Sequence, residues 1–242
     1  MKNPIVYIFL LSMIFFTHHG NAQNFAYETM DRPWSAELGI GPGWIYADNG
    51  GSFRNVGFSL SPAASFSLNK IIRPSLSLRG TLGFQGLLGN MDSDMDRRVE
   101  LGEEGNAYDF RGQAYYLDVA PVFRLFGSRE LVHRRKLNLY ASAGLGVMGI
   151  VSTNDIMQEG VSITRDNNMI IPYIPVRAGV SYRFRPLWDF ALEGSLLFTF
   201  NDNIDGNMGN NRLDDYPMNI QFKIRKFFTW KMINPLLGNP AY

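Results

Sequence analysis

One stretch decides the fold of this chain: Met218-Asn219-Ile220-Gln221-Phe222-Lys223-Ile224-Arg225, in which apolar and polar side chains alternate without a break. An alternation with period two indicates a β-strand with two different faces. Residues 190–201 show the same pattern, although Leu197 interrupts their polar face. Residues 202–215 are rich in Asn, Asp and Gly, which predicts a solvated loop. The two strands therefore form a hairpin with one apolar face and one charged face.

The same two-faced pattern recurs along the chain and predicts eight strands. They are expected over residues 35–46, 57–68, 74–87, 112–126, 137–151, 170–184, 190–201 and 218–225. A strand of about 9–11 residues crosses a bilayer at a tilt, and most of these are that long or longer. Long and short connections alternate, apart from one of medium length (127–136). Outer-membrane barrels have long loops outside and short turns in the periplasm, so both termini are expected in the periplasm.

The first 22 residues predict a signal peptide rather than part of the fold. Lys2 provides a positive start, residues 5–16 are apolar, and Gly20-Asn21-Ala22 is a small-residue cleavage site. A transmembrane anchor is the alternative, but the apolar run is short and no stop-transfer charges follow. Cleavage would leave a periplasmic lead-in at 23–34, a barrel at 35–230 and a periplasmic tail at 231–242.

Composition excludes several other classes of protein. The chain has no Cys, so neither disulfides nor thiolate metal sites are available. Loss of Lys2 with the leader lowers Lys plus Arg from 23 to 22, which equals the 22 Asp plus Glu. A neutral mature chain gives no indication of nucleic-acid binding. No apolar run of about twenty residues follows the leader, so a soluble β-protein or an outer-membrane barrel remains.

The residue types on the two faces favour lipid on the outside. A soluble lipocalin-like barrel also alternates, but its apolar face points inward. Here the apolar face is bulky, whereas the opposite face is rich in Gly and Ser, which suits the narrow interior of an eight-stranded barrel. Charges on that face could pair across the lumen. The expected lumen charge network is Glu37, Arg79, Asp118, Arg124, Arg177, Arg183, Glu193, Lys223 and Arg225.

We therefore predict an all-β, eight-stranded antiparallel up-and-down transmembrane β-barrel of the outer-membrane type with a filled, charged lumen. Five prolines fall inside the expected strands: Pro42, Pro62, Pro121, Pro172 and Pro175. Proline cannot donate to a ladder, and a closed barrel has no free edge. Bulges or splayed strand ends are expected there, above all at 171–175.

No catalytic or metal-binding constellation emerges from the sequence. Some eight-stranded barrels are lipid-modifying enzymes that use His with Ser and an acid, but His133 is the one histidine after the leader and lies in a basic turn. Residues 92–96 read D-x-D-x-D and Glu103 follows at the spacing of a calcium loop, yet Arg97 occupies the position that requires Gly. We expect a solvated acidic loop, no enzymatic activity, no metal and no cofactor.

Several segments resemble a known family. They are Ala36–Gly41, Asn138-Leu139-Tyr140, Gly144-Leu145-Gly146, Ile171–Val180, Phe190–Glu193 and Phe198–Gly206 with its Asp-x-x-Asp-Gly loop. Together they resemble small outer-membrane barrels related to PorG, the outer-membrane component of the type IX secretion and gliding machinery. The resemblance covers most of the mature chain and is looser before Arg111. It implies a non-enzymatic barrel that anchors a periplasmic ring of the secretion apparatus to the outer membrane.

Two functional hypotheses follow, besides contact with outer-membrane lipid. The first is a structural anchor that binds a periplasmic protein or lipoprotein. Its expected docking residues are Arg129, His133, Arg134, Arg135 and Lys136 in the basic turn, with Leu236 and Leu237 in the tail. The alternative is a small channel or ligand-binding barrel with a basic lumen, in which Arg79, Arg177 and Arg225 form an anion path. Ion conductance in planar bilayers discriminates between the two.

Overall fold

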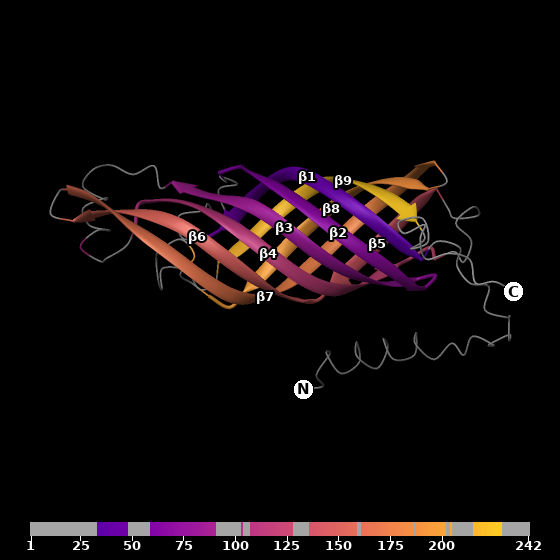
Figure 1. The fold of residues 1–242 in the computed structure, drawn as a ribbon. Helices are drawn as coiled ribbons and strands as arrows, with labels where there is room; N and C mark the ends of the chain where they lie inside the picture. The colour runs from indigo at the N-terminus through magenta and orange to yellow at the C-terminus, as the bar shows by residue number, and fades with distance from the viewer. Residues whose placement is uncertain are drawn as a thin grey trace, which may run out of the picture.

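The structure, a computed structural model, describes residues 33–47, 59–90, 103, 107–127, 136–158, 161–185, 187–201, 204 and 215–228. Within these ranges one antiparallel sheet contains all the strands (Figure 1). The strands are β1 (Trp34–Tyr46), β2 (Ser61–Arg73), β3 (Leu76–Asn90), β4 (Asp109–Arg124), β5 (Leu137–Ala143), β6 (Leu145–Gln158), β7 (Val161–Arg185), β8 (Trp188–Thr199) and β9 (Tyr216–Phe228). The expected leader, C-terminal tail and acidic loop at 91–96 lie outside the described residues.

The sheet closes into a ring. β1 pairs with both β2 and β9, and β3 pairs with both β2 and β4. β5 and β6 both lie between β4 and β7, and they share one register, because Ser142 lies opposite Val122 and Leu145 opposite Val119. They are therefore one barrel strand interrupted at Gly144. The nine labelled strands occupy eight positions around the ring, which confirms the predicted eight-stranded barrel.

The two ends of the barrel differ. Trp34 lies directly opposite Phe228, so β1 begins and β9 ends at the same end, here called the N/C end. The opposite end is called the loop end. There β6 and β7 extend together beyond the rest of the barrel (Figure 1), and remain paired as far as Gln158 opposite Val161. The pairing of β7 with β8 begins only at Tyr173.

The extension of β6 and β7 corrects the prediction of a polar loop at 152–168. The prediction treated polar residues as loop residues, but backbone ladders and cross-strand side-chain pairs also hold polar strands together. Thr164 lies opposite Asp155 and its hydroxyl donates to the Asp155 carboxylate over 2.7 Å. The predicted turn at 69–73 is likewise wrong. β2 continues to Arg73 because Asn69 turns inward and donates to Glu37 over 2.7 Å.

Of the two outcomes expected at the strand prolines, bulges are absent, but pairing with one neighbour opens or ends at each of them. The two register shifts among the described pairs lie at 71/73 and 183/185, away from every proline. Instead, pairing with one neighbour is interrupted at Pro42, Pro121 and Pro175 and resumes in the same register. Pro62 and Pro172 lie where pairing with one neighbour ends. Because proline has no N–H, each of these residues coincides with a local gap in the hydrogen-bond ladder to one neighbouring strand. The gap beside Pro121 is the point at which β5 and β6 separate.

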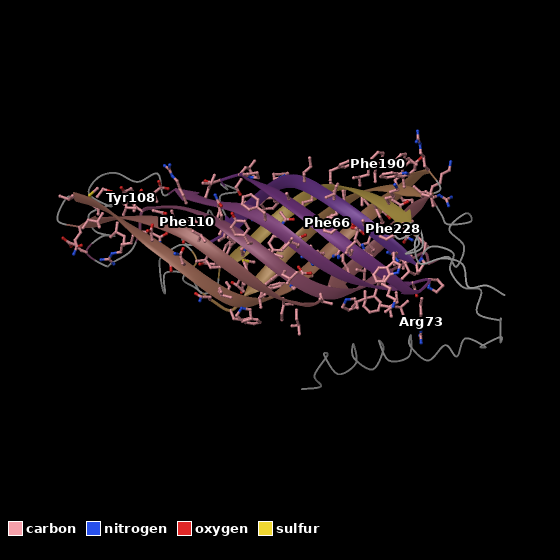
Figure 2. All side chains as sticks on the ribbon, viewed as in Figure 1. Phe66, Arg73, Tyr108, Phe110, Phe190 and Phe228 are labelled. Carbon is pink, nitrogen blue, oxygen red and sulfur yellow. The ribbon has the colours of Figure 1, made fainter. Side chains whose placement is uncertain are left out.

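The faces of the barrel are arranged as in a membrane protein. Large apolar side chains on the outer wall are more than half exposed, among them Leu38, Ile40, Leu82, Leu117, Leu192 and Phe222. Figure 2 shows side chains over the whole length of this wall. By contrast, Glu37 and Arg79 inside the barrel are 1% and 0% exposed. An outer wall of this kind is stable in contact with hydrocarbon. The soluble, lipocalin-like alternative requires the reverse arrangement.

Candidate functional site in the lumen

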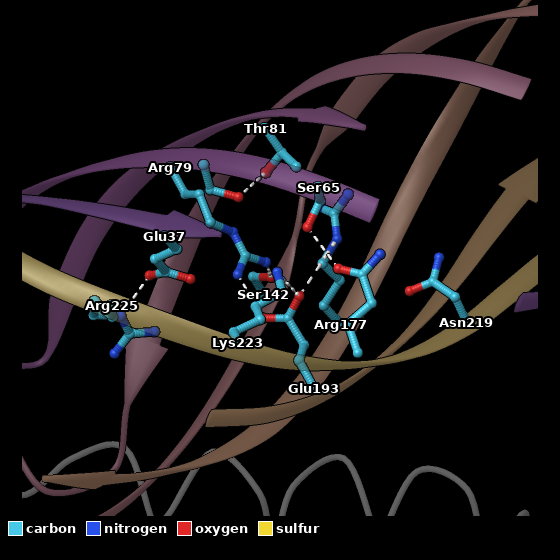
Figure 3. A network of polar contacts seen from close by, with 12 residues as sticks. Glu37, Ser65, Arg79, Thr81, Ser142, Arg177, Glu193, Asn219, Lys223 and Arg225 are labelled. Carbon is cyan, nitrogen blue, oxygen red and sulfur yellow. Dashed lines mark hydrogen bonds and ion pairs between the residues drawn. The ribbon is translucent and has the colours of Figure 1, made fainter. Parts of the chain in front are cut away.

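A buried glutamate links three strands inside the barrel. Glu193 of β8 accepts a hydrogen bond from Arg79 Nη1 at 2.6 Å and another from Lys223 Nζ at 2.7 Å. Arg177 Nε lies 3.9 Å from the same carboxylate. All four side chains are at most 2% exposed. Figure 3 shows them converging from the surrounding strands towards the middle of the lumen.

A second carboxylate, Asp118 of β4, fixes Arg177 from the other side. The two guanidinium Nη atoms of Arg177 donate to the two Asp118 oxygens at 2.8 and 2.6 Å. The Tyr173 hydroxyl donates to Asp118 Oδ2 at 2.6 Å. A bidentate pair is both directional and strong. Arg177 is therefore held in one position between β4 and β8.

Arg225 forms the third centre, nearer the N/C end. Its Nε donates to Glu37 Oε1 at 2.5 Å, and its Nη1 lies 3.7 Å from Asp189 Oδ2. The guanidinium also lies 5.4 Å from the centre of the Tyr140 ring, within cation–π range. Glu37 receives a further hydrogen bond from Asn69. Two acids and an aromatic ring thus surround this one cation.

Charges in this lumen network balance. Its four cations are Arg79, Arg177, Lys223 and Arg225, and its four acids are Glu37, Asp118, Asp189 and Glu193. Buried charges are tolerated when they are paired and hydrogen-bonded. Each of the three arginines assigned above to an anion path has a carboxylate partner.

The other half of the lumen contains an apolar cluster beside buried polar side chains such as Gln85 and Asn154. Towards the loop end, inward side chains form one hydrophobic cluster: Ile45, Ala47, Leu87, Phe110, Ala114, Tyr116, Met148, Ile150, Ile171, Tyr173, Leu197 and Ile204. Tyr116 and Tyr173 meet edge to face with ring centres 6.2 Å apart. The expectation of a lumen filled by small residues and charges therefore misses this cluster, of which Leu197 is the one member that the polar face of residues 190–201 had shown as an exception. The sequence contained evidence for this cluster, because its inward apolar residues make several strands apolar on both faces.

Glycines make room for the inward tyrosines. Tyr116 lies directly opposite Gly83 in the neighbouring strand, and a Cβ at Gly83 would lie 2.1 Å from its ring. The same pairing joins Tyr173 with Gly146, and Tyr140 with Gly179. Each ring thus lies across a strand that has no side chain at that point. This arrangement fills a narrow lumen without splitting the ladder.

The predicted site residues divide into three groups. Seven of the nine predicted lumen charges belong to the lumen network, whereas Arg124 and Arg183 are half-buried near the N/C end. The sequence prediction of lumen charges omitted Asp189. It lies four residues before Glu193 in the same strand and therefore on the same face, so the alternation could have identified it. Lys136 is exposed. The other predicted docking residues, Arg129, His133, Arg134, Arg135, Leu236 and Leu237, lie outside the described residues.

The described ranges contain no group of three or more His, Asp or Glu side chains that could hold a metal ion. They also contain no helix that is long and apolar enough to cross a membrane. What the lumen network can do chemically is hold charges in fixed pairs. His133, the histidine considered for catalysis in the sequence analysis, lies outside the described residues.

No protein-family model matches the chain, and no curated protein matches its sequence significantly. Solved structures do resemble it. A major outer membrane protein from Thermus thermophilus is 11% identical with a TM-score of 0.49, covering 81% of this chain and 99% of that one. Neisserial surface protein A is 11% identical with a TM-score of 0.48, covering 81% and 97%. Ail, the attachment invasion locus protein of Yersinia pestis, is 13% identical with a TM-score of 0.45, covering 82% and 100%. Likenesses of this size carry no function to the present chain.

Proposed function

We propose that this chain is a non-enzymatic outer-membrane barrel that anchors periplasmic components of a type IX-like secretion system. The observation that carries the proposal is the charge-balanced lumen network, backed by the apolar cluster behind it. A lumen filled in this way leaves the two ends of the barrel and the outer wall available for function. The secretion role itself rests on the resemblance of the sequence to PorG-like barrels.

The position of the chain ends supports an anchor. β1 begins and β9 ends at the N/C end, so the segments before Trp34 and after Phe228 emerge on the same side. Both would lie in the periplasm together with the basic turn at 127–136. A periplasmic protein or lipoprotein could then contact the turn and the tail at once, and two linked contacts increase the overall affinity.

The channel hypothesis receives less support. An anion path needs cations that are available to a passing ion, whereas Arg79, Arg177 and Arg225 each contact a carboxylate. Displacing such a pair costs a large desolvation energy. We therefore expect no steady conductance from the purified chain in planar bilayers. A sizeable steady conductance would favour the channel.

The anchor is tested in cells by deleting the gene and restoring it in three forms. The forms are the full chain, a chain without residues 232–242, and a chain in which those residues are scrambled. We expect secreted proteins to accumulate in the periplasm without the gene, and the full chain alone to restore export. Purification of the tagged full chain from detergent-solubilised outer membrane should recover periplasmic components, and both altered tails should lose them. Equal recovery with all three forms would contradict the docking role of the tail.

A further inference from the structure

Cationic and aromatic side chains lie side by side on the outer wall at the N/C end. Trp34 lies directly opposite Lys70 on one side and Phe228 on the other, and Trp188 lies opposite Lys226. Each of these residues occupies one of the alternating strand positions whose side chains point outward. With Arg73 and Arg185 at the adjoining turns they form a rim arc across five neighbouring strands, β2, β1, β9, β8 and β7: Arg73, Lys70, Trp34, Phe228, Lys226, Trp188 and Arg185.

The lysines of the rim arc lie over tryptophan rings. Lys70 Nζ is 5.5 Å from the centre of the Trp34 ring, and Lys226 Nζ is 5.1 Å from that of Trp188. A lysine in this position places its aliphatic stem against an apolar surface and its ammonium group towards water. Such a pair suits the boundary between hydrocarbon and head groups, where tryptophan is enriched.

The rim arc borders the apolar wall directly. Phe190 stacks on Phe184 with ring centres 4.1 Å apart and meets Phe222 at 5.3 Å. Beyond this aromatic row the wall remains apolar, with Leu192 and Ile40 more than half exposed. The change from an apolar wall through the aromatic row to cations marks the depth at which hydrocarbon gives way to head groups.

The rim arc has no opposing charge among the described residues. Its four cations are exposed, and none forms an ion pair within the described ranges. The described acids at this end are Glu37 and Asp189, and both are buried in ion-pair contact with Arg225. The loop end differs, because its described cations Arg111 and Arg165 lie among acids such as Asp109. Among the described residues of the outer surface, positive charge without an acidic partner is thus concentrated at one membrane boundary.

We propose that the rim arc binds the phosphate groups of anionic phospholipids in the leaflet at the N/C end. At the depth of the tryptophan rings, lipid phosphates are the anions that lie next to the wall. Arginine binds phosphate through paired N–H groups, and lysine binds it as a point charge. The rim arc would thereby fix the depth and tilt of the barrel. This inference concerns the barrel wall and is independent of any periplasmic partner.

The test uses the full chain reconstituted in vesicles of phosphatidylglycerol and phosphatidylcholine in equal amounts. Electron paramagnetic resonance of spin-labelled lipids measures how strongly each lipid associates with the barrel. We expect a roughly threefold preference for phosphatidylglycerol, since each surface cation attracts anionic lipid. The double variant Lys70→Gln/Lys226→Gln should lose more than half of this preference. The matched control, Arg111→Gln/Arg165→Gln at the loop end, should retain it.

Folding of each variant is checked by its mobility on unheated gels, and all four substitutions lie at exposed positions. Absence of a preference in the unmodified chain would overturn the proposal. So would an equal loss in the loop-end control, because the effect would then reflect net charge alone. Excess inorganic phosphate should leave the preference unchanged. Its abolition by phosphate would identify a site for free anions instead of lipid.

Discussion

Glu193→Gln tests whether the lumen network stabilises the barrel by charge pairing. Glu193 is fully buried, with cationic nitrogens at 2.6 and 2.7 Å on its two oxygens. Glutamine has nearly the same shape, but it offers one acceptor oxygen and turns N–H donors towards the other cation. Removing one partner of a buried ion pair costs about 3–5 kcal/mol. Because two cations lose their partner, we expect a loss in the upper part of that range.

The measurement is equilibrium urea unfolding of the barrel in phospholipid vesicles, followed by tryptophan fluorescence and extrapolated to zero urea. Asp166→Asn on the exposed part of β7 is the matched control, and it should change the free energy of unfolding by less than about 0.5 kcal/mol. The double variant Glu193→Gln/Lys223→Met restores neutrality in the network. It should therefore be more stable than Glu193→Gln alone, by about 1–2 kcal/mol.

Two results would refute this reasoning. A loss below about 1 kcal/mol for Glu193→Gln would mean that water reaches the network and screens the charges. A double variant less stable than the single one would mean that Lys223 stabilises the barrel independently of Glu193. Either outcome would remove the physical basis for a sealed lumen.

Three further substitutions test other parts of the structure by the same unfolding measurement. Gly83→Ala should cost about 1–3 kcal/mol, because its Cβ would clash with the Tyr116 ring, and adding Tyr116→Ala should recover part of the loss. Leu82→Arg, at mid-wall, should cost about 2–4 kcal/mol, and Leu125→Arg near the N/C end at most about 1 kcal/mol; equal costs would contradict the proposed position of the membrane. Tyr173→Phe should cost about 1.5–3 kcal/mol by leaving a buried carboxylate without its hydroxyl donor, and no change would contradict that role.

The architecture of the barrel could be predicted because each wall residue has two very different neighbours. Lipid on one side and a narrow lumen on the other force a period-two pattern, and residues 218–225 display it without a break. The number of strands and the inward direction of Glu37, Arg79 and Glu193 follow from that pattern. The pattern fails where the constraint ends. Beyond the barrel, β7 is exposed on both faces over residues 161–166, so alternation carried no signal there.

The partners within the lumen could not be predicted from the same pattern. Alternation places a residue on a face but gives no distance across the barrel. Arg79 is 114 positions from Glu193, and Arg225 is 188 positions from Glu37. These pairs depend on the register of several strands, and a shift of one residue would turn every side chain to the other face. Register also explains the prolines: the gap at Ala120 and Pro121 lies opposite Ala143 and Gly144, a correspondence that only the paired strands reveal.

The division of the lumen into two halves bears on what can pass through it. A hydrated ion that entered from the N/C end would have to break ion pairs such as Arg225 with Glu37 and Arg79 with Glu193. It would then have to pass the apolar cluster around Phe110 and Met148, beside which polar side chains such as Gln85 and Asn154 could replace only part of its water. The first half imposes the cost of separating buried charges and the second that of desolvation, and neither compensates for the other. A lipid head group bound at the rim arc, as proposed above, would face neither cost, because that site lies at the boundary with water. The contacts proposed above, at the ends and the wall of the barrel, require no such passage through its interior.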